Sequence, residues 1–512
     1  MQKKNYDSDF CGSVPLNFIN QIQPYGFLVI LKRSDLSIIQ VSQNIAGLLN
    51  EEPDQLINKS FNQFVEEQET KVFHTRFENK VDKLPVPLTI NANGQRKKYL
   101  AITHAKEEYF ILEIEEVQSK DDKDNSFISV YQDIKQAAYA IESADTVEDA
   151  YDITLRELKR ISGFDKIMIY QFDKDWNGIV VGEIQEEGME SYMGLRFPAS
   201  DIPKQARQLY LKNPYRQIPD CNYTPVKLYP IINPLTQTFI DLSDCNIRGV
   251  PAVHTEYLRN MKISASMSTR IIKDEKLWGL ISCHHRDPKF LSYELCSVFE
   301  LLSGILSAKF SSIQNKEEYD YSSRLQEIHA KLVEQIYRQG NVVEAISNGD
   351  STILDLLNIE GAAISYKKNL ETVGKTPDKN SLKDLIIWLQ TNNIDKTFHT
   401  TELSDVYEDG LKFTDIASGM IVLPIHAEKG EYILGFRPEV VEKVNWGGNP
   451  DEAINFEKDG KNYHPRNSFK LWQQTVKNTS LPWQKHELTV AENFRNVLVE
   501  YALKKYNPDV AK

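Results

Sequence analysis

The chain has 512 residues, a length that predicts about three or four domains of common size. Its formal net charge is −13, which argues against broad nucleic-acid binding because such binding needs a basic surface. The N-terminal residues lack the apolar core of a signal peptide, and no apolar run approaches the length of a membrane span. We therefore expect a soluble, cytoplasmic protein that engages neither a membrane nor nucleic acid.

Residues 25–117 predict a small α/β unit with an antiparallel sheet. Three apolar runs predict strands at 25–32, 37–42 and 109–117. Asn93-Gly94 lies within a fourth run and is a typical two-residue hairpin turn. The charged stretch 118–126 lacks apolar spacing, so we place a linker there.

Residues 127–310 predict a second domain. Two helical segments come first, followed by strands at 166–173 and 178–185. Strands return within 261–285, after the long stretch 201–257. This order predicts an antiparallel sheet with a large lateral insertion.

The stretch 201–257 gathers residue types that bind organic ligands. Asp201-Ile202-Pro203 opens a predicted helix, with Pro203 in its first turn, where a missing N–H costs little. One carboxylate, two guanidiniums, one imidazole and several phenols suit a flat, conjugated ligand with acidic side arms. Spacing alone, however, favours a solvated loop with ordinary surface charges.

A long helix is predicted within 291–339, which holds no proline. Its apolar residues step by three and four in two runs, Leu295, Val298, Leu302 and Ile305, then Leu325, Ile328, Leu332 and Ile336. Such a stripe fits either a helix packed on its own domain or a dimer seam. The narrowness of the stripe favours the dimer seam.

Residues 340–505 predict a third domain, with strands at 361–367 and 419–425. After residue 439 the sequence shows no clear helix or strand periodicity for about 45 residues. We call this segment the excursion, and a segment of that length is usually functional or disordered. Its aromatic residues, Trp446, Phe469, Trp472 and Trp483, argue against disorder. A final amphipathic helix is predicted to end near Tyr506.

The five cysteines are Cys11, Cys221, Cys245, Cys283 and Cys296. Their odd number and the lack of CxxC spacing argue against a disulfide framework or a zinc site. Cys11 lies in a polar segment, where a thiol is either an accessible covalent anchor or an incidental one. Successive strand residues point to opposite faces, so Cys283, His284 and His285 cannot converge on one metal ion. One histidine facing a pocket is the better interpretation, and we expect no metal site.

Several ordered motifs resemble those of the phytochrome family. They are Asp201-Ile202-Pro203, then Tyr210, Arg216 and Arg248, H-x-x-Y-L from His254, SCHH at 282–285 and PRNSF at 465–469. Cys11 ahead of QPYGFLVIL is similar to the bacteriophytochrome subfamily. The resemblance covers nearly the whole chain and implies a photosensory core of PAS, GAF and PHY domains.

The implied fold is α+β, with three consecutive PAS/GAF-like domains whose antiparallel sheets are flanked by helices, and a long connecting helical spine. The implied domains are an N-terminal segment and PAS domain at 1–118, a bilin-binding GAF domain at 127–310, and a PHY domain at 311–512 with a tongue at about 435–482 and a C-terminal signalling helix. The resemblance also implies a figure-eight knot between the N-terminal segment and the GAF domain, which sequence rules alone would reject as rare.

The implied function is red/far-red photoreception with biliverdin as cofactor. Plant and cyanobacterial phytochromes attach their bilin to a cysteine just before the histidine of H-x-x-Y-L, and here that residue is Val253. Attachment is therefore expected through a thioether to Cys11. The implied cofactor-binding residues are Cys11, Tyr170, Phe197, Asp201, Ile202, Pro203, Tyr210, Arg216, Arg248, His254, Tyr257, Ser266, Ser268 and His284.

Within this set the resemblance places the two arginines near the B-ring propionate and the two serines near the C-ring propionate. His254 is expected at the inner pyrroles and His284 beside the D ring, inside an aromatic wall. Two positions depart from the family pattern. Pro251-Ala252-Val253 replaces a common serine-proline pair, which puts a serine contact in doubt, and Tyr25 stands where histidine is common.

For signalling, the resemblance implies that Asp201 pairs with Arg466 in the dark and that light breaks this pair. Ser468 then replaces Arg466, and the tongue refolds from a hairpin toward a helix. A parallel or antiparallel homodimer through the GAF and PHY helices is expected, with an output domain in cis. That domain is a histidine kinase by family habit, with a response regulator as partner, but a cyclase or another output fits the sequence equally. No Walker loop or dinucleotide fingerprint occurs, so we expect no catalysis within these residues. The alternative is a pigment-free PAS-GAF module for ligand sensing or dimerisation.

Overall fold

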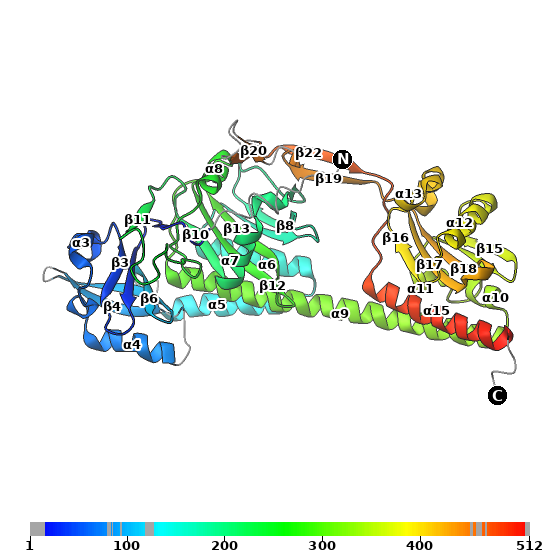
Figure 1. Ribbon diagram of the computed structural model, residues 1–512, viewed down its shortest axis with the longest axis horizontal. Coiled ribbons are helices and arrows are strands. Elements are labelled where there is room, and N and C mark those ends of the chain that lie inside the picture. The colour runs from blue at the N-terminus through cyan, green and yellow to red at the C-terminus, as the bar shows by residue number, and fades with distance from the viewer. Residues whose placement is uncertain are drawn as a thin grey trace. The chain divides into compact units, whose positions relative to one another are not determined.

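The computed structural model describes most of the chain. The described residues are 16–78, 83, 85–92, 95–117, 127–450, 454–456, 463–465 and 468–506. Asn93-Gly94, the predicted linker 118–126, Cys11 and Arg466 lie outside them. The chain forms two compact units, Met1–Ile313 with Asn445–Trp472 and Gln314–Val444 with Gln473–Lys512 (Figure 1).

The first sheet of the first unit has the strand order β1-β11-β3-β2-β6-β5-β4. Its strands are β1 (Gln21–Ile22), β2 (Phe27–Lys32), β3 (Ile38–Ser42), β4 (Pro85–Ala92), β5 (Gln95–Ala105), β6 (Tyr109–Glu116) and β11 (Val226–Tyr229). Short helices α2 (Ala46–Leu49) and α3 (Pro53–Leu56) and the longer α4 (Glu67–Glu78) accompany them. The predicted strands are confirmed, and Ala92 pairs with Gln95, the register that a two-residue turn requires.

The N-terminal segment lies between two parts of one long loop. On one side β1 pairs antiparallel with β11, with Gln21 opposite Lys227. On the other side Gly249 N donates to Gln21 O at 2.8 Å, and Gln23 N donates to Ile247 O at 2.8 Å. The same long loop thus contacts the N-terminal segment on both sides. A figure-eight knot requires this pattern of contacts.

The second sheet of the first unit has the order β10-β12-β13-β7-β8-β9-β19-β22. Its strands are β7 (Lys166–Phe172), β8 (Gly178–Gln185), β9 (Arg196–Phe197), β10 (Tyr215–Ile218), β12 (Ala265–Lys273), β13 (Lys276–His285), β19 (Glu442–Gly447) and β22 (Leu471–Val476). One face packs against α5 (Phe127–Glu142), α6 (Val147–Ser162) and the start of α9 (Tyr293–Gln339), with Met267 and Cys283 buried between them. The opposite face carries α7 (Lys204–Lys212) and is therefore free of that helical layer.

The sheet of the second unit has the order β15-β14-β18-β17-β16. Its strands are β14 (Gly361–Tyr366), β15 (Asn369–Gly374), β16 (Phe398–Thr400), β17 (Gly419–His426) and β18 (Glu431–Arg437). One face buries apolar residues of α9, α10 (Val342–Ser347), α11 (Ile353–Leu357) and α15 (Lys485–Tyr506). The other face buries α12 (Lys379–Thr391), α13 (Leu403–Val406) and α14 (Thr414–Ala417), so the sheet is covered on both sides.

The interpretation of the α9 stripe as a dimer seam is wrong. Leu325, Ile328, Leu332 and Ile336 are buried in the core of the second unit, together with Phe494 of α15. Val298 and Leu302 are likewise buried in the first unit. Helical periodicity identifies the apolar face of a helix but not what covers it. By length and composition α9 is the one helix of the described residues that could span a membrane, yet these apolar residues serve the cores.

The predicted excursion follows β18. It contains β19, β20 (Ile454–Phe456), β21 (Tyr463–Pro465) and β22, and β20 pairs antiparallel with β21. Residues 435–437 complete β18, so the excursion begins after Arg437 rather than at 435. The segment 445–472 belongs to the first unit, which brings part of the excursion to the second sheet.

Candidate functional site

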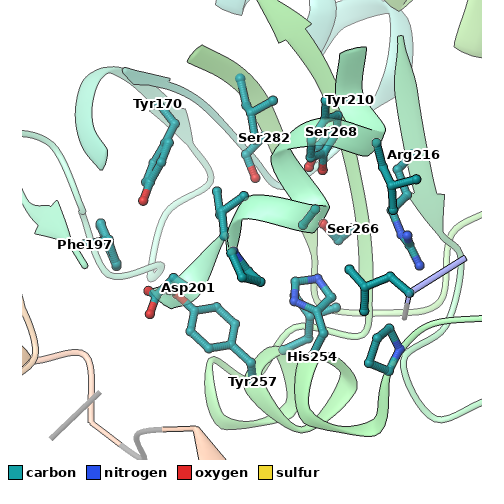
Figure 2. Close-up of a pocket in the computed structure, with 18 of the residues that line it drawn as sticks. Tyr170, Phe197, Asp201, Tyr210, Arg216, His254, Tyr257, Ser266, Ser268 and Ser282 are labelled. Carbon is teal, nitrogen blue, oxygen red and sulfur yellow. Dashed lines mark hydrogen bonds between the residues drawn. The ribbon is translucent and has the colours of Figure 1, made fainter. Parts of the chain in front are cut away.

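A cavity of about 330 Å³ lies in the first unit, on the face of the second sheet that α7 covers (Figure 2). Every predicted cofactor-binding residue within the described part of the chain lines it. They are Tyr170, Phe197, Asp201, Ile202, Pro203, Tyr210, Arg216, Arg248, His254, Tyr257, Ser266, Ser268 and His284. Cys11 lies outside the described residues, and Ser468 is exposed and not part of the lining. A concave, mostly apolar site with a few convergent polar groups is typical of cofactor pockets.

Strand register aligns the polar floor of the cavity. Ser266 lies opposite His284, and Ser268 lies opposite Ser282, on the paired strands β12 and β13. Because side chains alternate across a sheet, these four point to the cavity while Met267 and Cys283 point into the core. His284 lines the cavity, whereas His285 does not, and its Nδ1 lies 3.1 Å from Asp165 Oδ2.

The local sequence determines where the two helices that line the cavity begin. Pro203 is the N-cap of α7, one residue ahead of its predicted place in the first turn. Ala206, Leu209 and Tyr210 follow at helical spacing and all line the cavity. Helix α8 (Ala252–Asn260) begins after Pro251 and presents His254 to the cavity.

The two arginines have no acidic partner among the residues that the structure describes. Arg248 is 3% exposed and donates to Leu242 O at 3.2 Å and Cys245 O at 3.4 Å. Arg216 donates to Gly249 O at 3.2 Å, and the Nε of each arginine is buried without a hydrogen bond. Burial, and then the charge of Arg216, lower the pKa of Arg248 to about 9. Two desolvated cations side by side make a site that favours an anion.

Both histidines of the cavity are held neutral. Burial, and then the charge of Arg216, lower the pKa of His254 to about 4. Burial, and then the charges of Lys166 and His254, lower the pKa of His284 to about 3. The Nδ1 of His284 is buried without a partner, and its Nε2 lies 3.5 Å from Ser282 Oγ. A neutral imidazole can both donate and accept a hydrogen bond, which suits a ligand with several ring nitrogens and oxygens.

One end of the cavity is aromatic and meets the excursion. Tyr257 donates to Asp201 Oδ2 at 2.8 Å, and the Phe469 ring meets the Tyr257 ring edge-on at 5.1 Å. Pro465 lines the cavity, and Phe469 is 5% exposed. The PRNSF motif therefore reaches Asp201's neighbourhood, although Arg466 itself lies outside the described residues.

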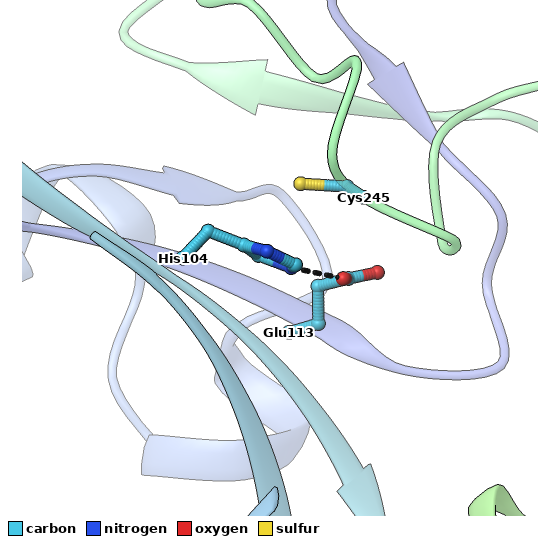
Figure 3. Close-up of side chains that lie close together, drawn as sticks. All are labelled: His104, Glu113 and Cys245. Atoms are coloured by element: carbon cyan, nitrogen blue, oxygen red, sulfur yellow. Dashed lines mark hydrogen bonds and ion pairs between the residues drawn. The ribbon is translucent and has the colours of Figure 1, made fainter. Parts of the chain in front are cut away.

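Glu113 of the first sheet bonds to the loop that carries Arg248, and His104 and Cys245 lie beside it (Figure 3). His104 Nε2 lies 2.5 Å from Glu113 Oε1, and Glu113 Oε2 accepts Ile247 N at 2.7 Å. Cys245 completes a buried group whose candidate ligand atoms lie within 4.8 Å of one another. Because Glu113 bonds both to His104 and to the main chain of the loop, these contacts account for the buried carboxylate without an ion.

Several lining residues were missed by the sequence analysis. They are Met168, Val180, Tyr192, Ser200, Asn213, Asn246, Met261, Leu280 and Ser282. Strand alternation would have found Ser282, because it lies two residues before His284. Tyr192 lies on an irregular segment and Ser200 in a 3-10 helix of three residues, Ala199–Asp201, so no periodicity gives a direction for either side chain.

The two departures are visible in the structure. Val253 and Pro251 both line the cavity. Tyr25 has a buried hydroxyl without a partner and lies 5.4 Å from the Phe290 ring. Burial raises the pKa of Tyr25 well above its usual value, so it is a neutral phenol.

Comparison with known proteins identifies relatives along the whole chain. Residues 11–117 match the model of a PAS fold, 146–308 that of a GAF domain and 325–507 that of the phytochrome region. Cyanobacterial phytochrome B from Nostoc is 37% identical over 98% of this chain and 67% of its own length. This chain thus spans about two thirds of that relative.

Two solved structures have similar folds. A bacteriophytochrome from R. palustris superposes with a TM-score of 0.83 at 32% identity, over 96% of this chain and 99% of the other. The phytochrome photosensory core module of Stigmatella aurantiaca gives a TM-score of 0.81 at 31% identity, over 96% and 98%.

Proposed function

The chain belongs to the phytochrome family of red/far-red photoreceptors as a PAS-GAF-PHY photosensory module, and from that premise we propose that its cavity holds biliverdin. The pigment is joined to Cys11 by a thioether. When bound, it supplies light absorption and a double bond between its C and D rings that isomerises. The residues of this chain hold, orient and tune it.

The pair Arg216 and Arg248 is the observation that carries this proposal. Two desolvated guanidiniums without a carboxylate among the described residues are unfavourable in an empty cavity. The propionate arms of a bilin supply the missing anions, and guanidinium forks match carboxylates in geometry. A pigment-free module would leave both cations uncompensated, which is why we prefer the photoreceptor.

The neutral groups of the cavity complete the proposed binding site. His254 and the main-chain carbonyl of Asp201 bond the inner pyrrole nitrogens, and Ser266 and Ser268 take the second propionate. His284 and the aromatic end with Tyr170, Phe197 and Tyr257 surround the D ring. These assignments rest on the lining of the cavity and on the neutral state of both imidazoles.

Attachment is tested on denaturing gels that reveal bound bilin by zinc-induced fluorescence. Val253 leaves no cysteine at the alternative position, and the four cysteines of the described residues are buried. Cys11→Ser should abolish the fluorescent band and retain reversible binding. Cys221→Ser is the control, because a serine hydroxyl can keep the bond of Cys221 to Ile263 O. An unchanged band in Cys11→Ser would overturn the linkage.

We propose that signalling runs from the cavity through the tongue. Asp201 pairs with Arg466 in the dark, and Ser468 replaces Arg466 after light. Asp201→Ala and Arg466→Ala should bind biliverdin and form little stable far-red-absorbing product in light–dark difference spectra. Full photoconversion with the parental reversion rate in both variants would disprove the latch.

We propose a cytoplasmic homodimer with an output domain in cis, a histidine kinase that acts on a response regulator. The α9 stripe is buried within each chain, so the dimer uses other residues of the GAF and PHY helices. Sedimentation of the photosensory module tests the dimer, because a monomer at all concentrations contradicts it.

A further inference from the structure

A buried ion pair lies beside the cavity, and neither of its residues is among those that line it. Lys166 Nζ lies 3.0 Å from Glu183 Oε1, and the two side chains are 2% and 4% exposed. The ammonium also lies 3.6 Å from the centre of the Tyr192 ring. Replacing a buried ion pair by apolar residues is often neutral or stabilising, so stability alone does not explain a charge in this place.

Glu183 holds the loop between β8 and β9. Its carboxylate accepts Tyr192 N at 3.0 Å, Met193 N at 3.2 Å and Ser191 Oγ at 2.5 Å. Lys166 donates to Glu190 O in the same loop. The pair thereby fixes Tyr192, whose ring lines the cavity and meets Phe197 edge-on at 5.7 Å.

Lys166 is also the cross-strand neighbour of His284. The two residues lie opposite each other on β7 and β13, so their side chains share one face of the sheet. That face is the cavity face, because Met168 and Tyr170 of the same strand line the cavity. A cation in a desolvated wall disfavours a second positive charge beside it.

We propose that Lys166, held by Glu183, is a positioning residue that keeps His284 uncharged and Tyr192 in place at the D-ring end of the cavity. The effect of Lys166 on bound pigment rests on the proposed function. The effect of Lys166 on the charge of His284 can be measured in the pigment-free protein.

The effect of Lys166 on the charge of His284 can be separated from the effects of the other neighbouring groups. Lys166 from β7 and His254 from α8 are the charged or titratable groups that lower the pKa of His284 after burial itself. Its partners on β12 and β13, Ser266 and Ser282, are neutral. A change at Lys166 therefore acts on His284 through charge, while His254 stays the same.

The first experiment is a histidine ¹⁵N NMR titration of the pigment-free protein, with His284→Gln to assign the signal. Lys166→Met removes the charge and keeps the apolar stem, and Lys166→Arg keeps the charge. Glu186→Gln is the matched control. Glu186 lies on the same loop, and its Oε1 forms a partly exposed ion pair of 2.6 Å with Lys159 Nζ of α6. The double variant Lys166→Met with Glu183→Gln removes both buried charges and retains an acceptor for the loop.

Lys166→Met should raise the pKa of His284 by about one unit, which is a roughly tenfold larger protonated fraction above pH 5, because the cation is gone and Glu183 keeps its negative charge. The double variant also removes that negative charge and should raise the pKa by less. Lys166→Arg and Glu186→Gln should titrate like the parent. A parental titration in the folded Lys166→Met variant would overturn the proposal, because a pair with a purely structural role has no effect on the charge of His284. The double variant keeps this test available if Lys166→Met alone fails to fold.

The second experiment measures absorption spectra after addition of biliverdin. Lys166→Met and the double variant should shift the absorption maximum and lower the yield of photoproduct, while Lys166→Arg should match the parent. Parental spectra in both charge-removing variants would overturn the tuning role. If the parent takes up no biliverdin, the proposed function fails, and the NMR titration still decides whether Lys166 sets the charge of His284.

Discussion

Buried arginines occur in both units, and their surroundings are opposite. In the second unit Arg437 Nη2 lies 2.9 Å from Glu487 Oε1, with side chains 6% and 1% exposed. In the first unit Arg248 is equally buried, but among the residues that the structure describes its guanidinium bonds only to carbonyl oxygens of its own loop, and its Nε has no hydrogen-bond partner. One arginine is compensated within the chain, and the other is not.

The hydrogen bonds around Arg437 show how complete the compensation is. The guanidinium donates to Asn358 O at 3.0 Å and Pro482 O at 2.8 Å, and it stacks 3.8 Å from the Trp483 ring. Glu487 in turn accepts Tyr321 Oη, Asn358 Nδ2 and Gln484 N. The difference separates an arginine that holds a fold together from one that is kept ready for a ligand.

The largest effect we expect is on the stability of the second unit. Arg437→Met leaves Glu487 buried without its cation and should destabilise the unit by about 3–5 kcal/mol. Hydrogen exchange of β17 and β18 in the pigment-free protein measures this loss. Arg437→Met with Glu487→Leu should recover most of it, and Lys375→Gln, at an ion pair with side chains 74% and 49% exposed, should change it by less than about 1 kcal/mol. A small loss in Arg437→Met would erase the contrast between the two arginines.

The next effect is on pigment binding. Arg248→Gln should leave the stability of the pigment-free protein nearly unchanged and weaken biliverdin binding by about 1.5–3 kcal/mol, or roughly 10–150-fold. Titration by absorbance in a Cys11→Ser background keeps binding reversible. Arg259→Gln is the control, because Arg259 is exposed on α8 and does not line the cavity. Equal affinities for the Arg248 and Arg259 variants would show that Arg248 does not bind an anionic group of the pigment.

A smaller effect is expected where the cavity meets the tongue. Tyr257→Phe removes one hydrogen bond to Asp201 of 2.8 Å, worth about 0.5–1.5 kcal/mol. The dark-reversion rate of the photoproduct should change by up to about tenfold, since about 1.4 kcal/mol is a factor of ten. Tyr319→Phe, at a residue 72% exposed, should revert like the parent. If Tyr257→Phe reverts at the parental rate, this hydrogen bond takes no part in signalling.

The smallest effect is on the pH dependence of the second unit. Burial raises the pKa of Glu487, but the bonds from Gln484, Asn358 and Tyr321 and the charge of Arg437 outweigh it, and the pKa is lowered overall. A lowered carboxyl pKa in the folded state gives stability above about pH 4.5 that is lost as pH falls through the folded pKa. Glu487→Gln should flatten the fall in stability between about pH 5 and pH 3. An unchanged slope would mean that other carboxyls dominate.

Much of the cavity could be predicted because its residues recur in ordered motifs. The alternation of Ser266, Ser268 and His284 along paired strands then follows from the pleat itself. Tyr192 could not be predicted, because it lies on an irregular loop whose direction is set by Glu183. The sequence also could not reveal that Arg437 meets Glu487, since the two are 50 residues apart and joined only by the fold.

The error on α9 has a general physical cause. Leu325 and Ile336 repeat at a spacing that fits a core helix and a coiled coil equally well. Only the tertiary structure shows that α15 covers this stripe. Periodicity therefore located the helix correctly and assigned its partner wrongly.

The placement of β1 sets the order of events during synthesis. Gln21 leaves the ribosome early, but its partners Lys227 and Gly249 follow more than 200 residues later. Contacts so distant in sequence form slowly, and here the loop can close only around a segment that is already in place. The β1–β11 edge of the first sheet therefore forms only after residues of the second domain have been made. A bulky protein fused ahead of the first residue should slow folding far more than the same protein fused after the last.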